Sequence, residues 1–387
     1  MPQLLAFVAA LLAAVGLIQT LLGARLVRQF RAAPAPRAHA LPAISVLKPL
    51  YGDEPLLEAA LASVCAQDYP RFQVVFGVQD PADPALAAVR RLRARFPACD
   101  IAVVIDDTAA GANRKVANLT NMLPAARHPV LVIADSDVHV APDYLRRIAA
   151  ALQPPGIGLV TTLYTGLPAS GALAGQLGAS AITHGFLPGA LLARRLGRQD
   201  ALGATMALRR ETLATIGGFA ALRDHLADDN LLGRKVRALG LRIGLAATVP
   251  ATTVPESRMR DLFRHELRWA RTIRALAPLP FAASAVQYPL AWALLAVALS
   301  GGARWTVALF ALAWLARALA ARAIERALGL ADGAGAIAAP WHLPLRDLMS
   351  AAVLLTSYMG DRVDWRGRSM RAARTSRPTA SLGTERA

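Results

Sequence analysis

The chain has 387 residues, of which 55% are hydrophobic, and it is long enough for one large domain plus segments embedded in lipid. Its formal net charge of +17 does not indicate nucleic-acid binding. The arginines flank apolar runs, as expected beside membrane spans, and no recognised nucleic-acid motif accompanies them. Its two cysteines, Cys65 and Cys99, exclude a disulfide framework and suit a reducing compartment.

The first element is an apolar stretch from Leu4 to Leu22, about the 20 residues that a bilayer-spanning helix needs. No charge precedes it, whereas a cleavable signal peptide would have a positive first segment and a shorter apolar core. We therefore expect an uncleaved anchor over residues 1–24. Arg25, Arg28 and Arg31 follow the anchor, which predicts that the next domain lies in the cytoplasm.

We expect a linker over residues 25–42, because their second half is rich in Ala and Pro. It leads to a domain that we expect over residues 43–275. Short β-type runs alternate with helical patterns in this domain: strands Ile44–Leu47, Gln73–Val78, Ile101–Ile105 and Val130–Ala134, and helices Pro55–Ala66, Pro84–Phe96 and Val116–Ala126. The alternation predicts an α/β fold with parallel strands and crossover helices on both faces. In such sheets, ligands bind beyond the carboxyl ends of the strands.

Residues 276–360 predict a membrane region with two to three further spans, at Leu279–Leu299, Trp305–Ala321 and, more weakly, Leu345–Tyr358. The last stretch is interrupted by Arg346 and Asp347, and it either crosses the membrane or lies in the interface. If it crosses, the arginine-rich tail emerges on the non-cytoplasmic side, against the positive-inside tendency. We expect residues 361–387 to form this basic, disordered tail.

Carboxylates follow two of the predicted strands. "VLVIADSDVHV" places Asp135 and Asp137 at the carboxyl end of one strand, and "VVFGVQDPADP" ends the other in Asp80 and Asp83. A turn before a helix would explain either alone. Together they predict a nucleotide site, with one carboxylate on the base or ribose and another on Mg²⁺ or Mn²⁺ bridging to phosphate oxygens. His139 is more typical of a packing or solvent-facing histidine than of a ligand.

Lysine is rare, and two of the three lysines lie in motif-like stretches. Lys48 is in "SVLKPLYGDEP", and Lys115 is in "GANRKVANLTNMLP" just ahead of a predicted helix. At that position Lys115 could neutralise a phosphate. Both lysines are therefore candidates for binding the nucleotide-sugar, beside the alternative of ordinary solvated lysines.

Two later stretches carry further candidate residues. "DHLADDNLLGRKVRALG" begins a helix with Asp228 and Asp229, either of which could be merely an N-cap or a first-turn charge. "FRHELRWARTIRAL" starts with His265 and Glu266, as a zinc-protease helix does. That interpretation fails, because Trp269 stands where the second histidine should be.

Together, these stretches resemble membrane-bound family-two and family-21 type glycosyltransferases. The closest resemblance is to the ceramide glucosyltransferase family with its bacterial hopanoid-glycosylating relatives. The matching stretches between Ser45 and Arg274 are "SVLKPLYGDEP", "QDYPRFQVVFGVQDPADP", "NRKVANLTNMLP", "DSD", "ADDNLLGRKV" and "RW". The resemblance implies a Rossmann-like GT-A fold with an N-terminal anchor and C-terminal transmembrane helices. It also implies a bacterial inner-membrane protein whose catalytic domain faces the cytoplasm.

The resemblance also implies roles for individual residues. Asp80 is expected to contact the uridine nucleotide. Asp135 and Asp137 are expected to hold the divalent metal, Mg²⁺ or Mn²⁺, on the diphosphate, with Asp135 also counted among the nucleotide-sugar contacts. Asp229 is expected to be the general base.

The last family motif is Gln or Arg, two residues, then Arg-Trp. Arg268 and Trp269 carry over as catalytic candidates, whereas His265 stands where the family has Gln or Arg, which leaves its role open. "ITHGFLPG" resembles a histidine-bearing stretch of the ceramide enzymes, so His184 is a further candidate near the acceptor.

This chemistry predicts an inverting transfer from UDP-glucose or UDP-N-acetylglucosamine to the hydroxyl of a membrane lipid, ceramide or a hopanoid, taken from the bilayer. The metal and cationic side chains would stabilise the leaving UDP. A carboxylate would take the proton of the attacking hydroxyl, and a single displacement inverts the anomeric centre. The alternatives are a polyprenyl-phosphate glycosyltransferase and a processive polysaccharide synthase.

Overall fold

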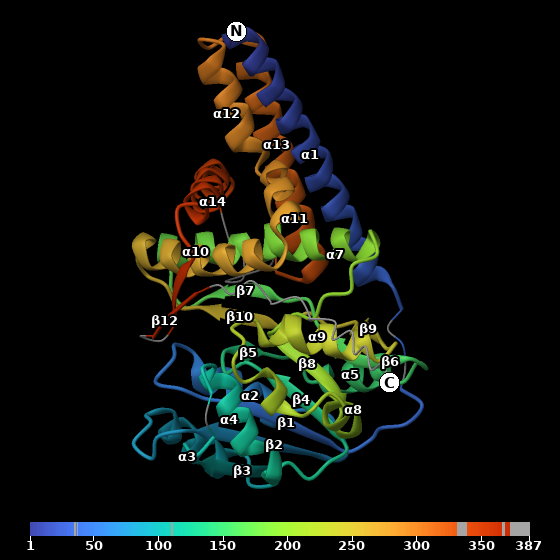
Figure 1. The fold of residues 1–387 in the computed structure, drawn as a ribbon. Coiled ribbons are helices and arrows are strands. Elements are labelled where there is room, and N and C mark those ends of the chain that lie inside the picture. Colours follow the sequence, from blue (N-terminus) through green and yellow to red (C-terminus); the bar gives the residue numbers. More distant parts are fainter. Residues whose placement is uncertain (35, 37, 110, 331–338, 366–367, 372–387) are drawn as a thin grey trace, which may run out of the picture.

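The computed structural model describes residues 1–34, 36, 38–109, 111–330, 339–365 and 368–371. Three layers follow one another along its long axis (Figure 1). At one end is a helical bundle, formed by α1 (Pro2–Ala32), α12 (Pro289–Leu299) and α13 (Arg304–Leu328). An α/β domain forms the other end. Helices that lie across the molecule separate the two, and they include α6 (Leu173–Ser180), α7 (Leu187–Arg195) and α10 (Met259–Leu276).

The α/β domain is built on a seven-stranded sheet of order β3-β2-β1-β4-β8-β6-β9. The strands are β1 (Ile44–Pro49), β2 (Phe72–Val78), β3 (Asp100–Ile105), β4 (Val130–Ala134), β6 (Ile157–Thr161), β8 (Thr205–Arg209) and β9 (Arg242–Leu245). The first four pair in parallel as predicted, but β8 runs antiparallel to both of its neighbours. The sheet is therefore mixed.

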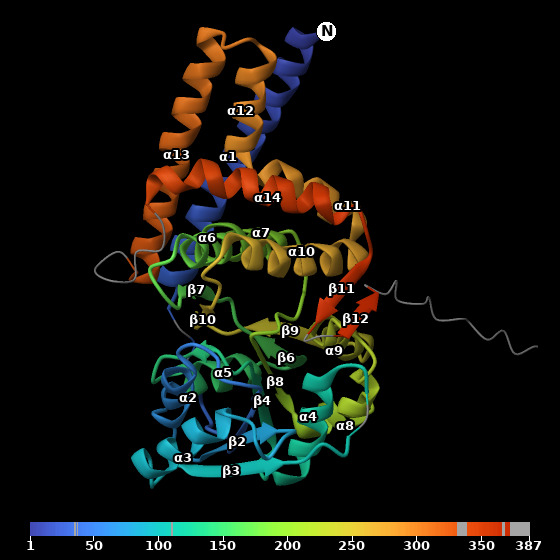
Figure 2. The same ribbon diagram turned by 90° about the vertical axis from the view of Figure 1, so that its left-hand side faces the viewer.

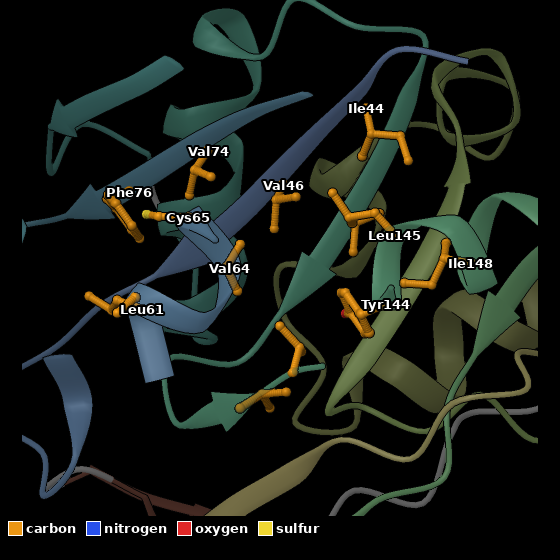
Figure 3. Close-up of a cluster of buried hydrophobic side chains, with 14 of the residues drawn as sticks. Ile44, Val46, Leu61, Val64, Cys65, Val74, Phe76, Tyr144, Leu145 and Ile148 are labelled. Atoms are coloured by element: carbon orange, nitrogen blue, oxygen red, sulfur yellow. The ribbon is translucent and has the colours of Figure 1, made fainter. Parts of the chain in front are cut away.

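Helices cover both faces of this sheet, as the alternating pattern predicts. One face packs on α2 (Leu57–Cys65), α3 (Ala85–Arg95) and α5 (Tyr144–Leu152), and the other on α4 (Arg114–Met122), α8 (Arg210–Thr215) and α9 (Asp228–Ala238). Side chains alternate between the faces, so Ile44 and Val46 join the first core while Leu47 joins the second. Figure 3 shows the first core, where Tyr144 and Ile148 of α5 meet the strands.

A smaller sheet lies between the main sheet and the transverse helices. It has the order β5-β10-β7 and comprises β5 (Val138–His139), β7 (Thr165–Pro168) and β10 (Ala251–Val254). Thr252 of β10 pairs with Val138 of β5, three residues beyond Asp135. The chain after β10 leads into α10, so this sheet connects the end of β4 to the transverse layer.

Two helices in the described part of the chain are long and apolar enough to cross a membrane, namely α1 and α13. The predicted span Leu279–Leu299 is instead a bent pair: α11 (Pro278–Ala283) with the 3₁₀ turn Ser284–Gln287, followed by α12 at 68°. If the pair counts as one span, the number of crossings rises to three. Tyr288 and Pro289 lie at the bend, and proline lacks the N–H needed to continue a helix.

The weakest predicted span is not among the helices of the described residues that are long and apolar enough to cross a membrane. α14 (Leu343–Ser357) has 15 residues and lies across the foot of the bundle (Figure 2). Arg346 and Asp347, which interrupt its apolar pattern, are both buried and paired with other helices. Both pairs are made with α14 in the transverse layer.

The structure also differs from the expected disordered tail at its first residues. β11 (Arg362–Trp365) and β12 (Arg368–Arg371) form an antiparallel hairpin beside α10. The chain entering it is held by Arg274, whose Nη2 donates to the carbonyl oxygen of Gly360 (3.0 Å) and to Asp361 Oδ1 (2.6 Å). The rest of the predicted tail, residues 372–387, lies outside the described residues.

Close backbone contacts hold α1 in the bundle. A Cβ added to Gly16 would overlap the backbone oxygen of Val286, and one added to Gly23 would lie 2.8 Å from Pro188 Cβ. We predict that Gly16→Leu forces α1 away from the bent pair and lowers the free energy of unfolding by about 2 kcal/mol. Thermal unfolding of the detergent-purified chain measures the change. Gly171→Ala is the control, because nothing lies within 4 Å of the added Cβ; equal melting temperatures for both variants would contradict the prediction.

Candidate active site

Asp135 and Asp137 lie where the sequence places them, in the turn between β4 and β5. Asp137 Oδ2 accepts a hydrogen bond from Thr252 Oγ1 of β10 (2.5 Å), and Asp135 Oδ1 lies 2.5 Å from Lys115 Nζ of α4. Burial, and next the negative charge of Asp135, raise the pKa of Asp137 to about 6. The two carboxylates therefore repel each other unless a cation is near.

The donor chemistry of this pair fits a hard divalent cation, which prefers carboxylate oxygens. No group of three or more His, Cys, Asp or Glu side chains that could hold a metal occurs among the described residues. A metal on Asp135 and Asp137 would therefore need further oxygen ligands from water or from a bound diphosphate. That requirement agrees with a site in which a metal binds together with a nucleotide.

Lys115 bridges two acidic parts of the site. Its Nζ lies 2.5 Å from Asp135 and 3.9 Å from Asp228 Oδ2 at the start of α9. Burial acts to lower the pKa of Lys115, but the charges of Asp135 and Asp228 raise it overall. Its side chain is only 16% exposed, so it is not an ordinary solvated lysine. The ammonium group is positioned to meet an anion bound beside Asp135.

Lys48 lies in the interior, behind the turn that carries Asp135 and Asp137. Its side chain has no exposed surface, and Nζ donates to the carbonyl oxygens of Ser136 (3.3 Å) and Val138 (3.1 Å). Burial lowers the pKa of Lys48 to about 8, against the opposing effect of Asp137. Because the amine donates to these carbonyl oxygens, Lys48 supports the backbone of the turn, and its contact with a nucleotide stays a prediction.

Asp229 lies one residue along α9 from Asp228. Its Oδ1 accepts the backbone N–H of Asn230 (2.7 Å), while Asp228 Oδ1 accepts a hydrogen bond from Asn113 Nδ2 (3.3 Å). Burial, and next the charge of Asp228, raise the pKa of Asp229 to about 6. A Cβ added to Gly203 would lie 3.0 Å from Asp229 Oδ2. A partly buried carboxylate of raised pKa is suited to accept a proton.

Asp80 lies in a cleft of about 560 Å³ beyond the carboxyl ends of β2 and β3. The lining residues are Gln79, Asp80, Pro81, Asp107, Ala109, Gly111, Arg114 and Ala117. Arg114 Nε donates to Gln79 Oε1 (3.3 Å), and its guanidinium lies 5.5 Å from the ring centre of Tyr51. The guanidinium of Arg114 gives this cleft a planar, charged wall, which suits a heterocyclic base. By contrast, both oxygens of Asp83 accept the Gly52 N–H (3.0 and 3.1 Å), which gives Asp83 a structural role.

α10 brings the residues of the last motif to Glu256. His265 Nδ1 lies 2.5 Å from Glu256 Oε1, and the rings of His265 and Trp269 meet edge to face at 4.3 Å. Burial acts to raise the pKa of Glu256, but the hydrogen bond and charge of His265, with a contribution from Arg268, lower it overall. Glu256 therefore acts as the anionic partner of this motif.

His184, expected near the acceptor, lies between α6 and α7. It is buried in the π-helical turn Ala181–Phe186, with Nδ1 2.9 Å from Ser180 Oγ and Nε2 3.2 Å from Glu325 Oε1 of α13. Burial lowers its pKa. His184 thus packs against a spanning helix, and its contacts are not with the acidic residues of the site. His139 has a packing role as expected, with Nε2 2.9 Å from Thr253 Oγ1.

Sequence reasoning missed three residues near the site. Glu54 accepts a hydrogen bond from Ser136 Oγ in the turn after β4 (2.5 Å). Burial raises the pKa of Tyr164, and the nearby carboxylates, Asp229 first, raise it further. Glu256 follows β10 by two residues, so the rule that carboxylates at strand ends mark a site could have found it. Tyr164 and Glu54 carry no comparable signal.

The raised pKa of Asp229 has a consequence for stability. Asp229 binds a proton more tightly in the folded state than in the unfolded state. Its protonation therefore stabilises the fold fully below about pH 4, and this stabilisation is lost as pH rises through about 6. We predict that Asp229→Asn raises the free energy of unfolding at pH 7.5 by up to about 3 kcal/mol, at about 1.4 kcal/mol per pKa unit. Melting curves from pH 4 to 7.5 measure the gain, which should shrink toward pH 4. The exposed Asp53→Asn is the control; an equal gain there, or none at Asp229, would contradict the prediction.

The arrangement matches a known family. Glycosyl transferase family 21 matches residues 8–377. Ceramide glucosyltransferase 1 of Caenorhabditis elegans is 23% identical over 62% of this chain and 51% of its own length. An N-acetylglucosaminyltransferase of Rhizobium meliloti is 26% identical over 60% of this chain and 56% of its own. The chain thus spans about half the length of these curated relatives.

A solved structure shares the fold. The mannosyltransferase PcManGT of Pyrobaculum calidifontis, in complex with GDP-Man and Mn²⁺, aligns with a TM-score of 0.53 at 21% identity, over 92% of this chain and 99% of its own. This likeness confirms the GT-A fold expected from the motifs. With the family match over most of its length, the chain belongs to glycosyl transferase family 21.

Proposed function

We propose that the protein transfers a hexose or an N-acetylhexosamine from a UDP-sugar to the hydroxyl of a membrane lipid, with inversion. The observation that carries the proposal is the gathering of Asp135, Lys115 and Asp229 at one edge of the sheet, beside the cleft of Asp80. Family membership supports sugar transfer, and the carboxylates supply the groups that this chemistry needs.

The donor would bind along this edge. The base would enter the cleft, where Asp80 can accept the N–H of uracil and Arg114 can stack on it. The diphosphate would then lie toward Asp135 and Asp137. A divalent metal bound by these carboxylates would neutralise charge on the leaving nucleotide. Lys115 adds a positive charge from the protein itself, because its Nζ is already 2.5 Å from Asp135.

Asp229 would take the proton of the acceptor hydroxyl. Its pKa of about 6 makes it a stronger base than an exposed aspartate, yet leaves it mostly ionised at neutral pH. No nucleophile of the enzyme is needed, so one displacement converts an α-linked donor into a β-linked product. Arg268 and Trp269 of α10 would complete the acceptor side of the site.

The arrangement of the helices supports a lipid acceptor that reaches the site from the membrane. The proposed location is the cytoplasmic leaflet of a bacterial inner membrane, which rests on the resemblance of the motifs. The transverse helices lie between the bundle and the α/β domain, at the level where a lipid head group would enter (Figure 2). With α1, the bent pair and α13 as crossings, the arginine-rich hairpin stays on the side of the α/β domain, as the positive-inside tendency favours. The relatives' names support ceramide as the acceptor, and glucose or N-acetylglucosamine as the sugar. A hopanoid acceptor and the UDP carrier rest on the resemblance of the sequence motifs.

Transfer of radiolabel from each UDP-sugar to extracted membrane lipids tests the proposal. We predict that the wild-type chain labels a lipid in the presence of Mn²⁺ or Mg²⁺, and that Asp229→Asn lowers transfer at least 100-fold because the general base is lost. Binding of UDP should persist in this variant, which calorimetry measures. Transfer by Asp229→Asn at the wild-type rate would rule out Asp229 as the base, and no labelled lipid with either donor would contradict the proposed function.

A further inference from the structure

Helix α14 carries two charges into a buried position at the foot of the bundle. The side chains of Arg346 and Asp347 are 2% and 1% exposed. Neither could be buried at this level without a partner of opposite charge. Their partners lie on two different helices, so α14 connects parts of the molecule that are far apart in the sequence.

Arg346 binds the motif-bearing helix α10. Its Nη1 and Nη2 each lie 2.7 Å from one carboxylate oxygen of Glu266, which makes the pair bidentate. Nη1 also donates to the carbonyl oxygen of Leu177 in α6 (3.2 Å), and Nη2 donates to Ser350 Oγ (2.9 Å). A bidentate pair fixes direction as well as distance. Glu266 is therefore held in one orientation.

Asp347, the next residue, binds the spanning helices. Its Oδ1 lies 3.2 Å from Arg317 Nη2 of α13, and its Oδ2 accepts the backbone N–H of Leu290 in α12 (3.1 Å). Arg317 Nη1 also donates to the carbonyl oxygen of His184 (3.2 Å). One turn of α14 is thus fixed to the bundle on one side and to α10 on the other.

The two sides of α10 have different partners. At about 100° per residue, Glu266 and Ala270 share the side that packs on α14, whereas His265, Arg268 and Trp269 lie on another side of the helix. On that side, His265 contacts Glu256 at the end of β10. A rotation of α10 about its axis would break the pair with Arg346 and turn Arg268 and Trp269 away together.

We propose that the Glu266–Arg346 ion pair positions the motif-bearing helix: it fixes the rotation of α10, and with it the direction in which Arg268 and Trp269 point. The Asp347–Arg317 pair fixes α14, and through it the rotation of α10, to the helical bundle. The inference rests on the proposed function. Buried ion pairs contribute little stability compared with apolar residues of similar size, so the main effect of the pair is on orientation.

Steady-state kinetics of the full-length chain in detergent, on Glu266→Gln, Arg346→Gln and Arg346→Lys, tests the inference. We expect the two Gln variants to lower kcat on the order of 100-fold, as a small misplacement of reacting groups does. The Kd for UDP should stay at the wild-type value, because the cleft of Asp80 is unchanged. Arg346→Lys keeps the charge and loses the bidentate geometry, so its kcat should be intermediate.

Glu325→Gln is the matched control, since it removes a carboxylate that is also 1% exposed but belongs to α13 and faces His184. It should lower the melting temperature and leave kcat unchanged. If the α10 and α14 variants lower only the melting temperature, as the control does, the pair is merely structural and the inference is wrong. If Arg346→Gln fails to fold, the kcat values of Glu266→Gln and Arg346→Lys decide whether the ion pair positions α10. A wild-type chain that neither transfers sugar nor binds UDP would overturn the proposed function, and this inference with it.

Discussion

The structure depends on bringing several carboxylates together at one edge of a sheet. Asp135, Asp137, Asp228 and Asp229 come from two separate segments, and burial raises the pKa of Asp137 and of Asp229 to about 6. Such a cluster is tolerated only with compensating positive charge. Lys115 supplies this positive charge between Asp135 and Asp228. Lys48 donates from the protein interior to the backbone of the turn after β4. The remaining repulsion favours a divalent cation, and with it an anionic diphosphate.

The second requirement of the proposed function is that this edge lies close to the membrane. The small sheet and α10 connect the turn after β4 to the transverse layer, where α14 binds both α10 and α13. Lipid substrates need not leave the bilayer if the residues that act on them are fixed to the spanning helices. The buried charges of α14 and the carboxylates of the site therefore follow the same rule. Each charge would be destabilising alone, and each is stabilised by an oppositely charged partner that also fixes its orientation.

Much of the fold follows from the sequence, because continuous apolar runs predicted β1 to β4 closely and strand ends predicted the positions of Asp80, Asp135 and Asp137. The family and its fold were predicted from six motifs and are confirmed. Long-range pairing was not predictable. The antiparallel β8, the transverse α14, the interior direction of Lys48 and the pairing of His184 with Glu325 all depend on partners distant in sequence. The roles of the site residues remain predictions.

The most direct test of this account is calorimetric binding of UDP to the purified chain, with Mn²⁺ and with the metal removed by chelation. The same titrations on an Asp135→Ala/Asp137→Ala variant show whether these carboxylates hold the metal. The account predicts tight binding by the wild type only when Mn²⁺ is present, and weak binding by the variant under both conditions. Equal affinity for UDP with and without metal, or in the variant and the wild type, would contradict it.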